Sequence, residues 1–268
     1  MSLKLTRRMP SFEGVAANQT ATLRLPIGFT YHQLWIAYGG TFTLANMTEI
    51  RVVANGQTIM RLDSGAVLDD YNTYEGRTAA GGLLCIDFDR YGMRTRAGEE
   101  FTALGTGAPN DTTPLTTLAV EIDIATATGP TLSARAVQSV PRPLGLIKKV
   151  RTFTFAPTGA GDFEIADLPR GDLINKVFFG FSANAISRLQ LERDNFTVFD
   201  RQELLNDRIQ ADGVRVPQAD YFVYDPTEGG NGAEGLVTAN VNDLRFILTM
   251  SGAASLTVGV EYIGSIEA

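Results

Sequence analysis

Polar and apolar residues alternate along the chain in short runs. Such period-two alternation is typical of β-strands that bury one face and expose the other. Two further runs, 33–38 and 177–181, are apolar at nearly every position, which predicts central strands buried on both faces. The alternating runs predict strands over 20–25, 49–53, 118–124, 188–192 and 255–262.

Turn residues separate the predicted strands. Asn55-Gly56 tolerates positive φ and joins two strand-like segments, which predicts a β-hairpin, and Asp194-Asn195 predicts a second turn of the same kind. Two short helices are expected, over 64–71 and 200–207, with Ser64 and Asp200 as N-caps. No segment carries a helical stripe long enough for a βαβ crossover. The pattern therefore argues against a Rossmann fold or a TIM barrel and favours antiparallel sheets.

The order of these elements occurs twice, at a separation of about 140 residues. The corresponding segments are 23–26 and 166–169, 34–38 and 176–181, 49–60 and 188–199, 67–70 and 204–207, and 118–123 and 258–263. A duplicated set of short strands predicts an all-β protein. We expect two tandem eight-stranded jelly-roll β-sandwiches, a double jelly roll, with short helices and long loops.

Proline and glycine divide the chain into two domains. The segment Gln138–Gly145 holds two prolines and a glycine and predicts a linker. We therefore expect an N-terminal arm plus the first jelly roll in 1–137, and the linker plus the second jelly roll in 138–268. Residues 91–114 and 216–240 are polar and rich in Gly, Pro, Asn and Asp, which predicts one long loop standing off each sandwich.

Composition and charge exclude several function classes. The chain has 268 residues, 44% of them hydrophobic, and a net charge of −7, which argues against a generally basic nucleic-acid coat and against specific nucleic-acid binding. A single cysteine excludes an internal disulfide. The N-terminus lacks the apolar core of a secretory signal, and no run approaches the ~20 apolar residues of a membrane helix.

The candidates for catalysis are few. His32 is the only histidine, so it is the only imidazole base, and it would need a nucleophile and an orienting carboxylate within reach. No Gly-x-Ser-x-Gly elbow is present. Cys85 lies within the apolar strand 83–87, which is typical of an inert buried thiol. We expect no catalytic residue, no enzymatic activity and no bound cofactor.

Acidic residues leave two alternatives open. Asp220, Asp225, Glu228 and Glu234 lie in or beside one glycine-rich segment, and calcium takes oxygen ligands from such segments. The spacing does not match an EF-hand, and the pairs at 69–70 and 206–207 are no better, so a structural calcium remains an open hypothesis without assigned ligands. Because carboxylates are plentiful, a carbohydrate-binding or carbohydrate-active β-sandwich also remains open, although Trp35 is the only tryptophan.

Islands of sequence resemble the corticovirus-type major capsid protein, the coat protein of a membrane-containing marine phage. The matching segments, in the same order and spacing, are Met9-Pro10, Val15–Asn18, Leu25–Tyr31, Gly129–Val140, Glu164–Arg170 and Val260–Gly264. These segments are strand edges and linkers and hold no chemical fingerprint. The similarity therefore lies in their joint order over nearly the whole chain.

The resemblance implies a viral major capsid protein that acts by assembly. It implies a homotrimeric, pseudo-hexagonal capsomer in an icosahedral shell over an internal lipid membrane, in the virion, after synthesis in the host cytoplasm. The implied partners are the chain itself, neighbouring capsomers, penton and minor capsid proteins, and the membrane. A phage receptor-binding spike remains an alternative, because spikes also use jelly rolls.

The N-terminal arm, Met1–Pro10, is the only clearly basic end of an acidic chain. Its charges are Lys4, Arg7 and Arg8. Each basic residue near an anionic bilayer contributes roughly 1 kcal/mol of binding. With the internal membrane that the resemblance implies, we expect this arm on the inner, membrane-side face of the shell; the alternative is a frayed terminus without contacts.

Overall fold

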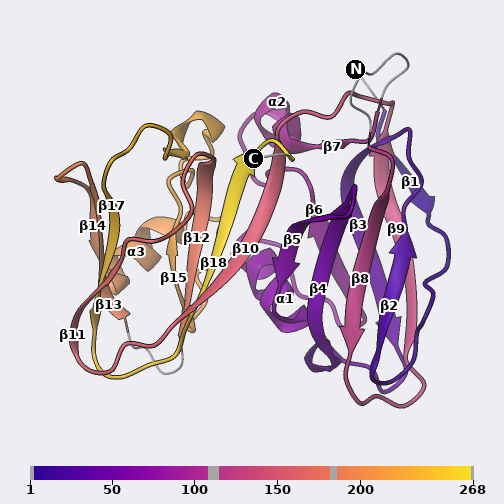
Figure 1. Ribbon diagram of the computed structural model, residues 1–268, viewed down its shortest axis with the longest axis horizontal. Helices are drawn as coiled ribbons and strands as arrows, with labels where there is room; N and C mark the ends of the chain where they lie inside the picture. The colour runs from indigo at the N-terminus through magenta and orange to yellow at the C-terminus, as the bar shows by residue number, and fades with distance from the viewer. Residues whose placement is uncertain (1–2, 108–114, 182–185, 267–268) are drawn as a thin grey trace.

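Two β-sandwiches stand side by side in the computed structural model, which describes residues 3–107, 115–181 and 186–266 (Figure 1). The strands of the first half are β1 (Leu5–Arg8), β2 (Gln19–Arg24), β3 (Thr30–Gly39), β4 (Met47–Ala54), β5 (Gln57–Leu62), β6 (Leu83–Asp87), β7 (Leu104–Gly105), β8 (Leu118–Ile124) and β9 (Thr131–Ser139). Those of the second half are β10 (Ile147–Phe155), β11 (Gly161–Ile165), β12 (Leu173–Phe181), β13 (Ile186–Arg193), β14 (Phe196–Gln202), β15 (Tyr221–Tyr224), β16 (Leu236–Val237), β17 (Leu244–Met250) and β18 (Leu256–Gly264). The helices are α1 (Gly65–Tyr74), α2 (Arg96–Glu99) and α3 (Glu203–Gln210), with short 3₁₀ turns at Leu44–Asn46, Glu100–Thr102 and Gly232–Glu234.

The two halves share one strand connectivity. In the first half the sheet β1-β9-β3-β6 faces β2-β8-β4-β5, and in the second half β10-β18-β12-β15 faces β11-β17-β13-β14. When the two-residue strands β7 and β16 are set aside, each half has eight strands within the described residues. Counted from the start of each half, the order is 1-8-3-6 in one sheet and 2-7-4-5 in the other. The predicted double jelly roll is therefore confirmed.

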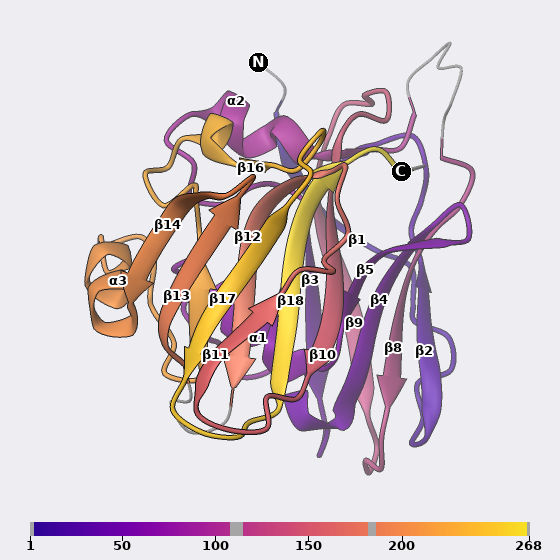
Figure 2. The same cartoon turned by 60° about the vertical axis from the view of Figure 1, so that its left-hand side comes forward.

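One sheet continues through both halves. Strand β10 pairs with β5 in parallel through Val150 and Met60, so that the two four-stranded sheets meet edge to edge (Figure 2). Ile147, Phe178 and Val223 of the second half are buried in the hydrophobic cluster of the first. The two sandwiches are therefore joined by a shared sheet and by shared apolar packing.

The predicted turns and one predicted helix cap are confirmed. Asn55, Gly56, Asp194 and Asn195 all have positive φ at the tips of their hairpins. The hydroxyl of Ser64 accepts a hydrogen bond from the Val67 amide and caps α1.

The other predicted cap is wrong. Asp200 lies in β14, where it binds Arg188 at 2.7 Å, and α3 begins at Glu203 after Gln202. The carboxylate that the sequence assigned to the helix is held by a cross-strand ion pair instead.

The predicted loops hold more structure than their composition suggests. Residues 216–240 include β15, whose apolar Phe222 and Val223 are buried at the edge of the second sheet. The described part of 91–114 includes α2, a 3₁₀ turn and β7. The prediction that 216–240 is one long loop is wrong at β15, because the long neighbouring strand β12 supports a strand of four residues there. Part of the other predicted loop, 108–114, lies outside the described residues.

The repeat is real, but its last correspondence is wrong. Segment 118–123 lies in β8, whose counterpart by position in the sheets is β17, whereas the counterpart of β18 is β9. The predicted linker also starts too early. Gln138 and Ser139 still belong to β9, where they pair with Tyr31 and Thr30, so a division between 137 and 138 would cut this strand.

Candidate functional site: assembly surfaces

The basic N-terminal segment is a strand with contacts, not a frayed arm. Its backbone pairs with β9 over Leu5–Arg8. The Lys4 ammonium lies 3.0 Å from carboxylate oxygens of both Asp89 and Glu100, so its charge is locally balanced. The Arg7 guanidinium lies 4.6 Å from the centre of the Phe29 ring. Of the three predicted residues, only Arg7 and Arg8 are exposed.

The structure places a serine and an aspartate beside His32. The imidazole Nδ1 lies 2.9 Å from Asp89 Oδ2, and Nε2 lies 2.9 Å from the hydroxyl oxygen of Ser139. Sequence reasoning missed both partners, because they lie 57 and 107 residues away along the chain. The sequence showed only that His32 lies just ahead of the predicted strand 33–38. The structure adds a β-bulge between Tyr31 and Gln33, which sets His32 apart from the regular register.

The side chains of His32, Asp89 and Ser139 are buried, and their polar atoms are engaged in contacts that join separate strands. His32 and Asp89 are 1% and 0% exposed, and Asp89 also binds Lys4. The hydrogen bonds link β3 and β9 to the segment that follows β6 and, through Lys4, to β1. Cys85 is buried as well, and burial raises the pKa of its thiol. The geometry supports structural roles for the histidine and the cysteine.

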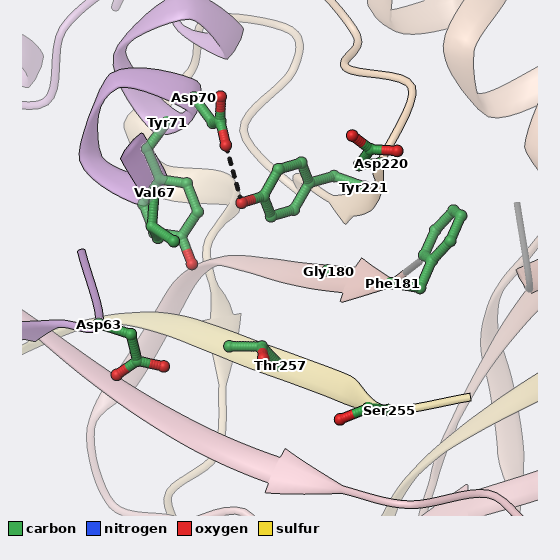
Figure 3. Close-up of a pocket in the computed structure, with 10 residues that line it drawn as sticks. All are labelled: Asp63, Val67, Asp70, Tyr71, Gly180, Phe181, Asp220, Tyr221, Ser255 and Thr257. Carbon is green, nitrogen blue, oxygen red and sulfur yellow. Dashed lines mark hydrogen bonds between the residues drawn. The ribbon is translucent and has the colours of Figure 1, made fainter. Parts of the chain in front are cut away.

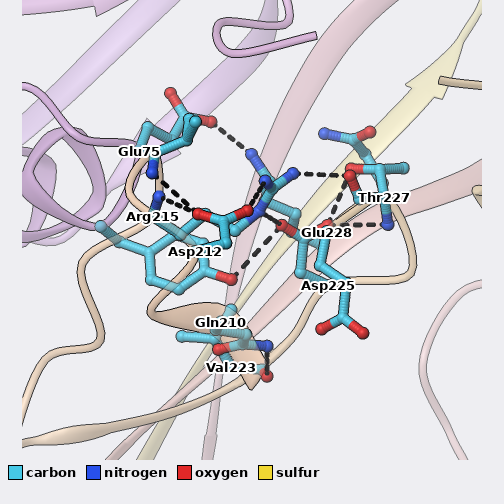
Figure 4. A network of polar contacts seen from close by, with 12 residues as sticks. Glu75, Gln210, Asp212, Arg215, Val223, Asp225, Thr227 and Glu228 are labelled. Atoms are coloured by element: carbon cyan, nitrogen blue, oxygen red, sulfur yellow. Dashed lines mark hydrogen bonds and ion pairs between the residues drawn. The ribbon is translucent and has the colours of Figure 1, made fainter. Parts of the chain in front are cut away.

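Two of the four acids of the open calcium hypothesis, Asp225 and Glu228, form ion pairs with arginines. Figure 4 shows Asp225, which binds Arg215 at 2.7 Å and accepts a hydrogen bond from the Thr227 amide at 2.8 Å. Glu228 forms a bidentate pair with Arg201 at 2.6 and 2.9 Å. No cluster of three or more His, Cys, Asp or Glu side chains suited to a metal ion occurs among the described residues.

A cavity of about 340 Å³ opens where α1 meets the second jelly roll (Figure 3). Asp63, Asp70 and Asp220 line it, and Asp70 accepts a hydrogen bond from the Tyr221 hydroxyl at 3.0 Å. Burial raises the pKa of both Asp63 and Asp70. The cavity is part of the junction between the halves.

Aromatic packing forms the centre of this junction. Tyr71 of α1 stacks on Phe178 of β12 with the ring centres 3.8 Å apart and the planes within 13°. Tyr74 meets the same ring edge to face at 5.4 Å. Opposite Tyr71 stands Gly259, where an added Cβ would lie 1.8 Å from the tyrosine hydroxyl oxygen. Helix α1 of the first half therefore packs closely on the outer face of the sheet β10-β18-β12-β15 of the second half.

Buried ion pairs surround the aromatic contact. The Lys176 ammonium binds Glu75 at 2.6 Å, and both side chains are almost fully buried. Burial alone would raise the pKa of Glu75, but the ammonium groups of Lys176 and Lys148 outweigh it and hold that pKa below its ordinary value. Burying two charges costs free energy, and burying either one without its partner costs more. A packing of the two halves that separated Lys176 from Glu75 would leave both charges unpaired, so such a packing is disfavoured.

Two surfaces of the described residues lie at opposite ends of the molecule, away from this junction. The first, which we name the β14–α3 face, carries the exposed apolar side chains Phe196, Val198, Leu204, Leu205 and Ile209. The second is the outer face of β1-β9-β3-β6, where Trp35 is half-buried beneath the Arg77 guanidinium, 5.3 Å from the ring. Strands β14 and β1 lie at the far left and far right of Figure 1. Exposed apolar patches such as the β14–α3 face mark protein contacts.

Two tandem jelly rolls joined edge to edge are the fold of double jelly-roll viral major capsid proteins. Residues 6–139 match the family model described as viral coat protein P2 N-terminal domain, and residues 147–266 match the one described as viral coat protein P2 C-terminal domain. The chain therefore belongs to the viral coat protein P2 family, and its place is in the capsid of a virion.

Individual relatives agree with this assignment. Major capsid protein P2 of Pseudoalteromonas phage PM2 is 28% identical over 262 residues, which are 95% of this chain and 94% of that protein. The crystal structure of the major capsid protein P2 from bacteriophage PM2 matches with a TM-score of 0.90 at 25% identity and covers 98% of both chains. The predicted corticovirus-type resemblance is confirmed.

More distant structures share the fold alone. The STIV major capsid protein matches with a TM-score of 0.71 at 12% identity, over 98% of this chain and 97% of that one. The PBCV-1 virus capsid protein matches with a TM-score of 0.63 at 11% identity, over 100% and 97%. Within the described residues, no helix is long and apolar enough to cross a membrane.

Proposed function

We propose that three copies of this major capsid protein form a pseudo-hexagonal capsomer of an icosahedral shell over an internal membrane. The observation that carries the proposal is the repeated connectivity of the two jelly rolls, side by side in one chain. Three such chains around a threefold axis present six nearly equivalent sandwiches. A unit of that shape tiles a hexagonal lattice with closed symmetry at each capsomer.

The mass of the assembled unit tests this proposal. We expect light scattering to give three times 29.0 kDa for the purified protein, or larger assemblies built from that unit. A stable monomer at micromolar concentration, together with particles that contain no trimers, would contradict it. A monomer with measurable sugar affinity would instead favour the carbohydrate-binding alternative.

The shell needs other proteins as well. A pseudo-sixfold unit cannot occupy a fivefold vertex, so an icosahedral shell of these capsomers requires a separate penton protein there. Minor capsid proteins are the further partners that the resemblance implies. Enzymatic activity plays no part in the proposal, in keeping with relatives that are structural capsid proteins.

The N-terminal segment is proposed to lie on the membrane side of the shell. Arg7 and Arg8 supply its exposed charge, since Lys4 is held by two carboxylates. Three copies in a trimer bring six arginines to one surface, and several weak contacts of about 1 kcal/mol each then act together.

Liposome binding tests the membrane role. We expect the Arg7→Ser/Arg8→Ser variant to bind anionic vesicles more weakly than wild type at low salt, and the difference to vanish at high salt. The matched control, Arg24→Ser/Arg61→Ser, removes the same charge from exposed arginines elsewhere and should bind like wild type. Equal binding by all three proteins would remove the electrostatic role of the segment.

A further inference from the structure

The cavity at the junction gathers carboxylates without a cation. Asp63 follows β5, Asp70 belongs to α1, and Asp220 precedes β15. None of the described residues that line the cavity is basic, and no described residue forms an ion pair with these three carboxylates. Arg61, whose charge acts on Asp63, binds Glu49 at 2.5 Å instead. The cavity is therefore a concentration of negative charge that no ion pair within the described chain neutralises.

These carboxylates repel one another. Burial raises the pKa of Asp70, the hydrogen bond from Tyr221 offsets this only in part, and the charges of Asp69 and Asp220 raise the pKa further. Asp63 and Asp220 are exposed and Asp70 is half-buried, so a ligand can reach all three from solvent. A bound cation would favour the ionised form of each carboxylate and relieve their repulsion.

A buried hydroxyl group beside them lacks a partner as well. Tyr71 is only 6% exposed, yet no described residue forms a hydrogen bond with its hydroxyl group. In Figure 3 this hydroxyl group points into the space between Tyr221 and Asp63, among the residues that line the cavity. Buried polar side chains are nearly always hydrogen-bonded, so the free hydroxyl group indicates a polar ligand in the cavity.

The carboxylates do not converge as metal ligands do. Among the described residues, no three His, Cys, Asp or Glu side chains form a group that could hold one metal ion. Much of the remaining lining is apolar and includes Val67, Phe181 and the rings of Tyr71 and Tyr221. Separated negative charges beside an apolar wall favour an elongated ligand, in which cationic groups are spaced along an aliphatic chain.

We propose that this cavity binds a linear polyamine, an aliphatic chain that carries several ammonium groups. The ammonium groups pair with the carboxylates of Asp63, Asp70 and Asp220, and one of them donates a hydrogen bond to the hydroxyl group of Tyr71. The methylene groups lie against the apolar lining, as the stem of a lysine side chain lies on an apolar surface. Because α1 belongs to the first jelly roll and β15 to the second, the bound polyamine stabilises their contact. The site lies within one chain and does not depend on the proposed trimer.

Calorimetric titration with spermidine tests the site. We expect Asp70→Asn and Asp220→Asn each to bind spermidine at least about tenfold more weakly than wild type, because each substitution removes a hydrogen bond between charged groups. The matched control is Asp167→Asn, which removes the same charge from an exposed carboxylate outside the cavity and should bind like wild type. The chain has a net charge of −7 and attracts any polycation, so similar affinities in all three variants would mean unspecific attraction and overturn the site.

Competition with calcium separates a polyamine site from a metal site. Calcium carries the same charge as the diamine putrescine but has no aliphatic chain. We expect putrescine to displace spermidine at concentrations at which calcium does not. If calcium displaces spermidine as well as putrescine does, the cavity recognises charge alone and the polyamine proposal is wrong.

Thermal melting shows that the variants are folded and gives a second readout. Without ligand, Asp70→Asn and Asp220→Asn should melt at or above the temperature of wild type, because each removes a charge that its neighbours repel. Spermidine should raise the melting temperature of wild type and of Asp167→Asn, and should raise it less in the two cavity variants.

The variant Tyr71→Phe tests the site without changing its charge. It removes one hydroxyl group and keeps the ring that stacks on Phe178, so it decides the question even if a carboxylate variant does not fold. We expect Tyr71→Phe to bind spermidine about fivefold more weakly than wild type, the usual effect of one lost hydrogen bond. Unchanged affinity would show that the ligand does not reach the buried hydroxyl group and would overturn the proposed site.

Discussion

We expect substitutions of the buried charged residues at the junction to cause the largest losses in the free energy of unfolding. Glu75 and Lys176 bind each other at 2.6 Å within the contact between the halves. Replacing Glu75 by Gln leaves a buried ammonium without its counter-charge, and breaking a buried pair in this way costs about 3–5 kcal/mol. We expect urea unfolding of Glu75→Gln to show that loss. The double variant Glu75→Leu/Lys176→Met, which removes both charges, should be nearer to wild type in stability.

The pH dependence of this pair has a definite sign. The folded-state pKa of Glu75 is lowered, so its contribution to stability is complete above the ordinary value of 4.5 and is lost as pH falls through the folded value. The pKa of Lys176 is raised above 10.5, so its contribution is lost only as pH rises beyond that range. We expect the stability difference between wild type and Glu75→Gln to be flat near neutrality and to shrink in acid below about pH 4.5. A difference that grows on acidification would contradict the assigned partners.

At the same scale, the sequence could identify candidate residues but not the residues that form hydrogen bonds with them. His32 and Cys85 were predicted to be structural, and both are buried. Asp89 and Ser139 could not be chosen from the sequence, because only the tertiary fold brings them to His32. Similarly, the sequence shows the acidic residues near 225, but it does not show that Arg215 and Arg201 neutralise Asp225 and Glu228.

At the scale of elements, a substitution at Gly259 tests the close packing of α1 against β18. A Cβ at Gly259 would lie 1.8 Å from the Tyr71 hydroxyl oxygen, so Gly259→Ala must push the helix away from the sheet. Overpacking of this kind costs about 1–3 kcal/mol. We expect a lower melting temperature for Gly259→Ala by differential scanning calorimetry. Gly252→Ala, where the added Cβ meets nothing within 4 Å, should melt close to wild type.

Elements with a strong local signal were predictable, and those that depend on a neighbour were not. Alternation predicted β2, β4, β8, β13 and β18, and positive-φ residues predicted the hairpin turns. Strand β15 is four residues long and lies in a segment rich in turn residues, so only its pairing with β12 identifies it. The N-terminal segment was predicted as an arm for the same reason, because its pairing with β9 spans the whole first half.

For the whole molecule, the shared sheet predicts that the halves are not independent. Val150 and Phe178 of the second half help to fill the first core, and β5 has β10 along its edge. We expect fragments 1–146 and 147–268, expressed separately, to bind a hydrophobic dye and aggregate, whereas co-expression should restore a soluble complex. Two separately soluble, cooperatively melting fragments would show that the junction contributes little to folding.

At this scale the sequence predicted the duplication but not every pairing within it. The retained order of strand, turn, hairpin and short helix was enough to predict two jelly rolls. The last correspondence failed because β8 and β18 have similar alternation yet occupy different sheets. Alternation indicates a strand and its buried face, and it carries no information on which strand lies beside it.

The position of the C-terminal strand has a consequence for biosynthesis. Strand β18 lies between β10 and β12 in the sheet that joins the halves, so β10 and β12 lack this shared neighbour until residues 256–264 leave the ribosome. The first jelly roll closes earlier, when β9 inserts between β1 and β3. During the seconds that separate these events, at roughly 5–20 residues per second, the second half is an open set of strands. A chain truncated before β18 leaves β10 and β12 without their shared neighbour, so it cannot form the sheet that joins the two halves.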